Sequence, residues 1–206
     1  QGLTTDTPMQ ISGQPKFSFK KFGKNEILKK EGEKCNNIAI LLSGDVKVVA
    51  HADDHSYSIE EHIKAPCILQ IEHFMGLSPH YPRTFTSVDE SDTVEICQSD
   101  LMHISDEFII FRINMLNIVS AMAQKAERKL WHPMPTELRA RIATFLKLRC
   151  LSPIGSKVIR IKMTRLAQEL GTSRLNVSEA LNAMQADGVL HFSRGIISVP
   201  QVEKLR

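Results

Sequence analysis

The segment Gly171–Leu181, GTSRLNVSEAL, constrains the fold more than any other part of this chain. It follows a short helical pattern, Met163–Leu170, and its glycine suits the left-handed conformation that ends a helix. Thr164 is the expected cap of that first helix, and Ser173 or Thr172 the cap of the next, which stops at Gly188. Apolar residues recur along the second helix at i, i+3, i+4 and i+7 and predict its buried face: Val177, Ala180, Leu181 and Met184.

A β-hairpin is predicted after these helices. Residues 190–192 and Ile196–Val199 have the character of strands around the turn Ser193-Arg194-Gly195, and Val158–Ile161 that of a strand before the first helix. Two helices joined at a glycine turn and followed by a hairpin predict a winged helix-turn-helix.

The charge of the chain is distributed unevenly. Residues 1–135 hold 14 Lys and Arg against 18 Asp and Glu, whereas residues 136–206 hold 12 against 5 and carry a net charge of +7. An excess of basic groups on a small domain suits a phosphate backbone. An alternative, in which these helices pack on a protein partner, stays open. The candidate DNA contacts are Thr164, Arg165, Thr172, Ser173, Arg174, Leu175, Asn176, Ser178, Glu179 and Arg194.

The N-terminal half is predicted to be β-rich. Short apolar or alternating runs, such as Ile38–Leu42, Val46–Val49 and Thr93–Ile96, are separated by Gly, Asp, Asn and Pro. Strands of this length and spacing predict an antiparallel sandwich or barrel. The expected fold class is therefore α+β.

A long helix is predicted between the two halves, since residues 106–130 contain no Pro or Gly. Phe111, Met115, Ile118 and Met122 recur at spacings of four, three and four, which is typical of a seam on a helix that pairs with its copy in a dimer while also covering its own β domain. The alternative is that the seam packs only on the β domain. Pro133 and Pro135 end the helix. The expected domains are residues 1–105, 106–132 and 133–206.

The remaining composition argues against membrane, secreted and enzymatic roles. No run of about 18 apolar residues occurs, and the first residues are polar. Cys35, Cys67, Cys97 and Cys150 lie about 30 or more residues apart without a Cys-x-x-Cys pair, which favours reduced thiols in a cytoplasmic protein. A jelly-roll metalloenzyme would need a compact His-x-His or Glu/His ligand set, and the sequence offers none at usable spacing.

Both halves together resemble the Crp/Fnr family of bacterial transcription regulators over about residues 16–206. The sensor pattern of that family is matched by Gly32-Glu33 and by Leu41–Val48, LLSGDVKV, and its DNA-binding signature by Leu166-Ala167 and Gly171–Leu181. The resemblance implies a jelly-roll sensor domain of the cyclic-nucleotide-binding type, a dimerisation helix and a winged helix. The partners it implies are double-stranded DNA with a palindromic site, a second copy of the chain and RNA polymerase.

The resemblance also implies an effector site at Glu72, Arg83 and Thr84. Family members that bind cyclic AMP hold its ribose with a Gly-Glu pair and its phosphate with an Arg-Ser or Arg-Thr pair. Arg83-Thr84 matches the second pair, but no glycine precedes Glu72 in Ile71–Leu77. We therefore expect a small effector other than cyclic AMP.

Haem-based sensing of gases or redox stress is the alternative within the family, and it makes His73 and Met75 the candidate axial ligands. The cofactor stays open, with cyclic nucleotide and haem both considered. An alternative of another class is a cyclic-nucleotide-type regulatory subunit that does not bind DNA, against which the winged helix argues.

The resemblance makes Arg174 the residue that reads a guanine. Leu175 replaces a Glu found in many relatives, and Glu179 replaces a second Arg of the cyclic-AMP members. A leucine favours a thymine methyl group, and a glutamate accepts from a cytosine or adenine amino group. We expect a half-site that keeps one guanine and differs from the TGTGA-type element.

Overall fold

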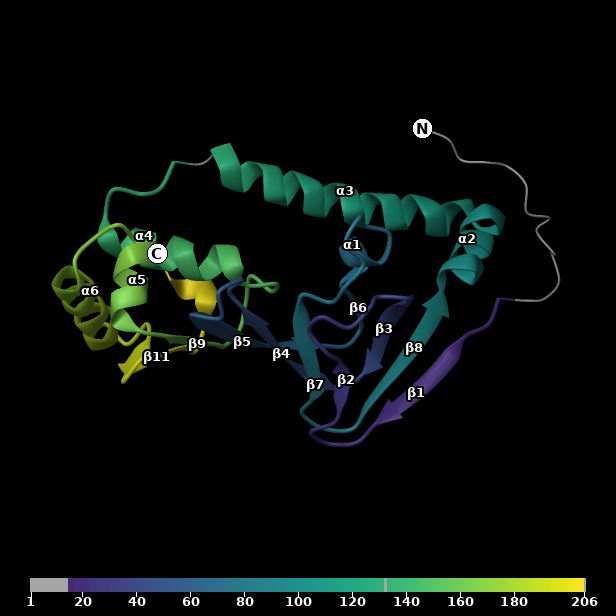
Figure 1. The fold of residues 1–206 in the computed structure, drawn as a ribbon, viewed down its shortest axis with the longest axis horizontal. Helices are drawn as coiled ribbons and strands as arrows, with labels where there is room; N and C mark the ends of the chain where they lie inside the picture. Colours follow the sequence, from purple (N-terminus) through teal and green to yellow (C-terminus); the bar gives the residue numbers. More distant parts are fainter. Residues whose placement is uncertain (1–14, 132, 206) are drawn as a thin grey trace.

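The computed structural model describes residues 15–131 and 133–205. A β sandwich occupies one end of the molecule and a small domain of helices and a hairpin the other, while a long helix runs along one side of both (Figure 1). The expected α+β class is confirmed. Residues 1–14 of the expected sensor domain, His132 of the boundary segment and Arg206 lie outside the described residues.

The strands are mostly short, and the helices vary in length from four residues to 23. The strands are β1 Ser18–Phe22, β2 Ile27–Lys29, β3 Asn37–Ser43, β4 Asp45–His51, β5 Tyr57–Lys64, β6 Cys67–Leu69, β7 Arg83–Ser87, β8 Ser91–Cys97, β9 Lys157–Ile161, β10 His191–Ser193 and β11 Ile196–Val199. The helices are α1 Ile71–Phe74, α2 Gln98–Glu107, α3 Ile109–Trp131, α4 Leu138–Arg149, α5 Met163–Glu169, α6 Arg174–Ala186 and the 3₁₀ turn η1 Val202–Lys204.

Two sheets form the sensor sandwich. One has the strand order β1-β8-β3-β6. The other has the order β10-β11-β9-β5-β4-β7-β2, in which β5, β4, β7 and β2 belong to the sandwich and β9, β11 and β10 to the C-terminal domain. The sandwich matches the predicted antiparallel jelly roll, and its two sheets stay separate instead of closing into a barrel. The core of the sandwich is formed by side chains of these strands that are almost fully buried, among them Ile38, Leu41, Val46, Val48 and Phe85.

The predicted long helix is two helices. α2 ends at Glu107, Phe108 adopts an extended conformation, and α3 begins at Ile109. Asp106 and Glu107 therefore end α2 and do not begin the long helix. No Pro or Gly marks this break, and the Phe108 N–H still donates to the Ile104 carbonyl at 2.8 Å, as in a continuing helix.

The predicted dimer seam on α3 faces the chain's own sandwich. Phe111, Met115 and Met122 pack against the core of the sensor domain, and Ile118 lines a cavity beside it. These residues thus cover the chain's own domain, although Ile118 is 38% exposed, and their pairing with a second copy stays a prediction. Other apolar residues of α3 are exposed: Ile109, Ile110, Ile113, Leu116 and Val119.

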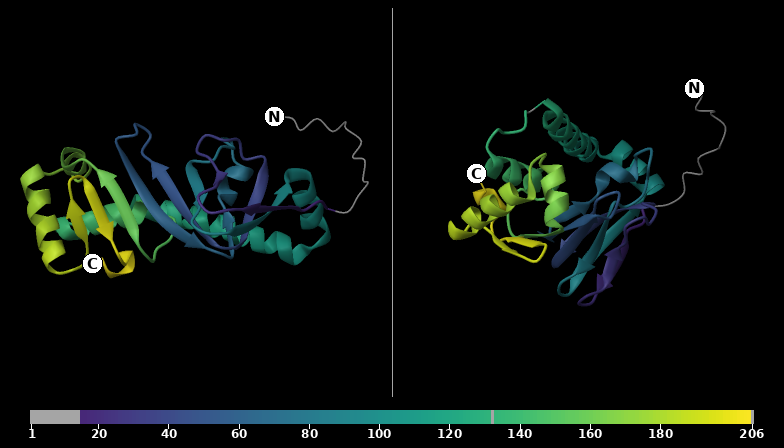
Figure 2. Two further views of the ribbon diagram at one scale, coloured as in Figure 1. Left: turned by 90° about the horizontal axis from the view of Figure 1, so that it is seen from below. Right: turned by 60° about the vertical axis from the view of Figure 1, so that its left-hand side comes forward.

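The sensor and the C-terminal domain share a sheet. β5 of the sandwich pairs antiparallel with β9, from Tyr57 opposite Ile161 to Glu61 opposite Lys157. β9 pairs on its other side with β11 of the wing. Ile59 of β5 is buried within the core of the C-terminal domain, so the two domains meet as one continuous sheet (Figures 1 and 2).

A buried ion pair lies at one end of this shared ladder. Lys157 Nζ lies 3.0 Å from Glu61 Oε2, and the two side chains are 0% and 2% exposed. Glu61 also accepts the backbone N–H groups of Leu151 at 2.8 Å and Ser152 at 3.0 Å. Three donors on one carboxylate offset the cost of removing these charges from water.

We predict that Glu61→Ala opens this junction, because it leaves the buried Lys157 ammonium and two half-buried backbone N–H groups without an acceptor. The cost should be about 3–5 kcal/mol. Burial raises the pKa of Cys150, which lies in the same region, to about 11, so its thiol should react slowly with iodoacetamide until the junction opens.

The measurement is urea unfolding together with the rate of Cys150 alkylation. Glu60→Ala, on the neighbouring residue of β5, is the matched control and should change stability by less than about 0.5 kcal/mol. Equal effects of the two substitutions would contradict the role of the ion pair.

Candidate nucleic-acid interface

The turn between α5 and α6 depends on Gly171. Its φ is +57°, a conformation that costs little only for glycine, and Thr172 N–H reaches the Ala167 carbonyl at 3.0 Å to close the end of α5. The predicted role of Thr164 as a cap is incorrect. Lys162 occupies the N-cap position without a side-chain cap bond, and Thr164 is an exposed residue inside the first turn.

Ser173 caps α6. Its Oγ accepts the N–H of Asn176 at 3.1 Å, which selects Ser173 over Thr172 among the two predicted caps. The Thr172 hydroxyl instead accepts a hydrogen bond from the Asn176 side-chain amide at 3.2 Å. The polar groups at the start of α6 are thereby held in one arrangement at an exposed end of the helix.

One face of α6 is buried and the other is open. Val177, Leu181 and Met184 are almost fully buried, as the periodicity predicts, and Ala180 is half-buried. α6 lies at the end of the molecule away from the sandwich (Figure 1). The predicted contacts on its open face are exposed, except for the half-buried Ser178: Arg174, Leu175, Asn176, Ser178 and Glu179.

The wing ends in a tight turn that presents Arg194. Arg194 and Gly195 both have positive φ, +40° and +83°. A Cβ at Gly195 would lie 3.3 Å from the Ile161 carbonyl oxygen, and the Gly195 carbonyl accepts the Ile161 N–H at 2.8 Å. Glycine is required here by both conformation and space, and Arg194 is left exposed at the tip.

Six basic side chains of this domain are exposed and form no ion pair with the residues that the structure describes: Lys147, Arg160, Lys162, Arg174, Arg194 and Lys204. Others are neutralised internally, for example Arg139 by Asp187 at 2.5 Å. Exposed unpaired cations attract phosphate groups regardless of base sequence.

Arg165, one of the expected DNA contacts, pairs with two carboxylates of the chain itself. Its Nη2 lies 2.7 Å from Glu169 Oε1 and 3.3 Å from Asp54 Oδ2, at the tip of the β4–β5 hairpin of the sensor. The side chain is half-buried, and its Nε has no hydrogen-bond partner. Arg165 therefore belongs to the domain junction in this arrangement.

Two of the three predicted effector residues lie together. Arg83 Nη1 donates to Gln70 Oε1 at 3.0 Å, and Gln70 Nε2 donates to Glu72 Oε1 at 3.1 Å. Glu72 Oε2 and Arg83 Nε are buried without partners, and burial lowers the pKa of Arg83. Thr84 is used elsewhere, since its hydroxyl accepts the Glu31 N–H at 3.1 Å. Sequence reasoning missed Gln70, for which the only signal is its position beside the altered segment.

Glu72 and Arg83 line a cavity of about 700 Å³. Its walls also include Val119 and Met122 of α3 and Leu151 after α4. A second cavity, of about 860 Å³, shares Glu72, Met122 and Leu151 with the first. Both cavities are bounded by the sensor sandwich, the long helix and the C-terminal domain.

The predicted haem ligands do not lie in these cavities. His73 is half-buried on α1, and Met75 is exposed and accepts a hydrogen bond from the Gln98 side chain at 3.3 Å. Neither side chain lines either cavity.

Comparison with known proteins agrees with this arrangement. The family model of the Crp-like helix-turn-helix domain matches residues 140–206. A transcriptional regulator from Thermotoga maritima is similar in structure with a TM-score of 0.51 and 20% identity, over 55% of this chain and 88% of that one. The catabolite activator protein of Thermus thermophilus has a TM-score of 0.50 and 18% identity, over 89% of this chain and 85% of that one.

No curated protein sequence matches the chain. The matches that are found confirm the predicted resemblance to the Crp/Fnr family and the predicted fold. Among the described residues, no helix is long and apolar enough to cross a membrane.

We predict that Ser173→Ala destabilises the protein by about 1 kcal/mol, because it removes the acceptor that caps α6. Ser173→Asp is the matched control, since aspartate caps equally well and should restore most of the loss. Chemical denaturation measures both variants. Equal losses in the two would show that the hydroxyl does not act as a cap.

Proposed function

We propose that this chain, whose residues 140–206 belong to the Crp-like helix-turn-helix family, is a transcription regulator that binds specific double-stranded DNA as a homodimer. A small effector, different from cyclic AMP, would bind between its sensor domain and α3. The main support for the proposal is the exposed face of α6. There Arg174, a side chain that can read a base, lies at a helix start fixed by the Ser173 cap.

The argument for sequence-specific binding separates affinity from specificity. Arg174 is the first residue of α6 and is exposed, and the N-terminal residues of a recognition helix are those that contact base edges. Arg160, Lys162 and Arg194 are exposed cations outside α6 that can hold phosphates. Because these cations outside α6 supply affinity for the DNA backbone, Leu175 and Glu179 of α6 are free to contact bases.

The argument for a dimer rests on a second face of α3. Ile109, Ile113 and Leu116 follow one another at spacings of four and three, and Leu116 is 61% exposed. Ser120 continues this face and is also exposed. An apolar stripe on a 23-residue helix, on a different side from the one that covers the sandwich, suits a symmetric contact with a second copy.

The argument for an effector rests on the two buried groups without partners. An occupant of the cavity of about 700 Å³ would complete Arg83 by accepting a hydrogen bond and Glu72 by donating one. A small polar molecule with both kinds of group fits this chemistry. The cavity also borders Arg149 and Cys150 of the C-terminal domain, so occupancy and domain placement would be coupled.

A regulatory subunit without DNA binding would leave these features of α6 unexplained. Its helix start, exposed arginine and neighbouring unpaired cations would have no role. Selection from random DNA duplexes distinguishes the two functions. We expect an interrupted palindrome with half-sites roughly 34 Å apart, and no enrichment with or without effector would contradict the proposal.

We predict that Arg174→Ala relaxes the preference at one base pair of each half-site by about 1–3 kcal/mol, because it removes a bidentate contact to guanine. Arg194→Ala is the matched control and should weaken all sequences uniformly and reduce the salt dependence of binding by about one ion. Binding to a panel of single-base variants measures both. A uniform loss for Arg174→Ala would make it a phosphate contact.

We also predict that Ile113→Glu with Leu116→Glu converts the dimer to single chains, because it places charges inside the apolar contact. Met102→Glu, at an exposed apolar position of α2, should leave the dimer intact. Light scattering on the purified protein gives the mass. A dimer that survives the double substitution would place the contact elsewhere.

A further inference from the structure

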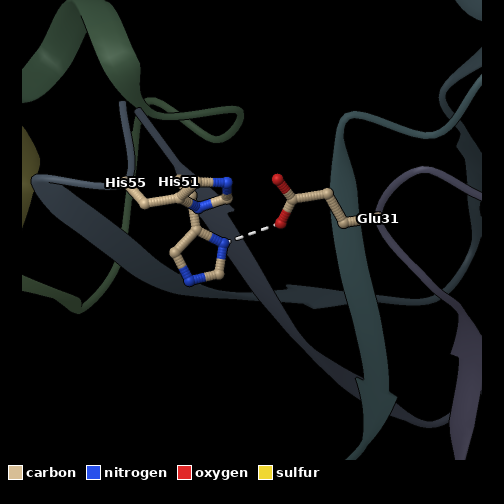
Figure 3. A group of neighbouring side chains, drawn as sticks. All are labelled: Glu31, His51 and His55. Atoms are coloured by element: carbon tan, nitrogen blue, oxygen red, sulfur yellow. Dashed lines mark hydrogen bonds and ion pairs between the residues drawn. The ribbon is translucent and has the colours of Figure 1, made fainter. Parts of the chain in front are cut away.

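The β4–β5 hairpin brings three metal-ligating side chains together outside the sites described above. His51 is the last residue of β4, His55 lies in the hairpin turn, and Glu31 lies in the turn after β2. One ligand atom from each residue lies within 4.8 Å of the other two. Figure 3 shows the Glu31 carboxylate and the two imidazole rings facing a common space.

The backbone of each of these residues is fixed. The Glu31 N–H donates to Thr84 Oγ1 at 3.1 Å, and the His55 N–H donates to the Ala52 carbonyl at 2.8 Å. His51 is held in the ladder between β4 and β5. The side chains themselves are exposed or half-buried, so rotation about their own bonds can adjust the ligand atoms.

The present spacing of the three side chains differs from that of metal ligands. His51 Nδ1 lies 2.7 Å from Glu31 Oε2, and the rings of His51 and His55 are 5.4 Å apart. Around a tetrahedral zinc ion, nitrogen and oxygen ligands lie about 3.4 Å from one another. Binding an ion therefore requires the His51–Glu31 contact to open from 2.7 Å, which rotation of these side chains allows.

We propose that Glu31, His51 and His55 form a binding site for a divalent transition metal of the zinc class. Two imidazoles and one carboxylate suit such ions, whereas Mg²⁺ and Ca²⁺ prefer oxygen ligands alone. Three protein ligands leave the remaining coordination position to water, as in exchangeable sites and not in closed structural ones.

The site lies where an ion would act on the domain junction. Asp54, in the same hairpin turn, pairs with Arg165 of α5 at 3.3 Å, and β5 continues from that turn into the ladder with β9. Glu31 belongs to the body of the sensor. An ion held by Glu31, His51 and His55 ties the hairpin tip to the sensor and stabilises the hairpin that carries the C-terminal domain.

Titration of the full chain with Zn²⁺, followed by calorimetry, tests the site, and Co²⁺ absorption reports the ligand set. We expect one ion per chain at this site. His51→Ala and His55→Ala should each lower the affinity at least about tenfold, since even partners outside the ligand set change affinity by that amount. Zn²⁺ should raise the melting temperature of the wild-type protein and not of these variants.

His62→Ala is the matched control. His62 makes the same kind of contact, with Nδ1 3.0 Å from Asp45 Oδ1, but it has no third ligand within the described residues. This variant should bind Zn²⁺ like the wild type. Binding that survives both His51→Ala and His55→Ala, for example at the half-exposed Cys97, would overturn the proposal, as would no binding at all.

Discussion

The buried ion pair between Glu61 and Lys157 fixes how the two domains sit against each other. A charge pair without water persists only when its remaining hydrogen-bonding capacity is met, and the N–H groups of Leu151 and Ser152 meet it here. These donors come from the chain that leads into β9. Because β9 carries the wing on its other side and runs directly into α5, the orientation of α6 follows from a strand of the sensor.

The shared sheet places the C-terminal domain so that it helps to enclose the two cavities beside the long helix. α3 covers the sandwich with Phe111 and Met115, and its later turns line cavities that Leu151 closes from the other side. A molecule that enters either cavity thus contacts the sensor, α3 and the segment held by Glu61. An allosteric effect needs two sites and a contact that differs between states, and the junction is where the proposed effector and DNA sites would be coupled.

Local features were predictable from the sequence, and tertiary choices were not. Gly171, Ser173 and the buried face of α6 follow from caps and periodicity, which act within a few residues. Either edge of β9 can pair with another strand. The residues of β9 alone therefore do not show that it pairs with β5 of the sensor. The charge of Arg165 fits a phosphate as well as it fits Asp54, and α3 has apolar residues on two faces. Glu31 and His51 are 20 residues apart and meet only through sheet pairing.

Hydrogen exchange of the β9 amides tests the shared sheet most directly. The Ile161 N–H donates to the wing at Gly195, and N–H groups alternate sides along a strand, so those of Val158 and Arg160 point to β5. We predict that these two amides exchange about as slowly as those of Ile159 and Ile161. Fast exchange at Val158 and Arg160, with Ile159 and Ile161 still protected, would show that the two domains do not share a sheet in solution.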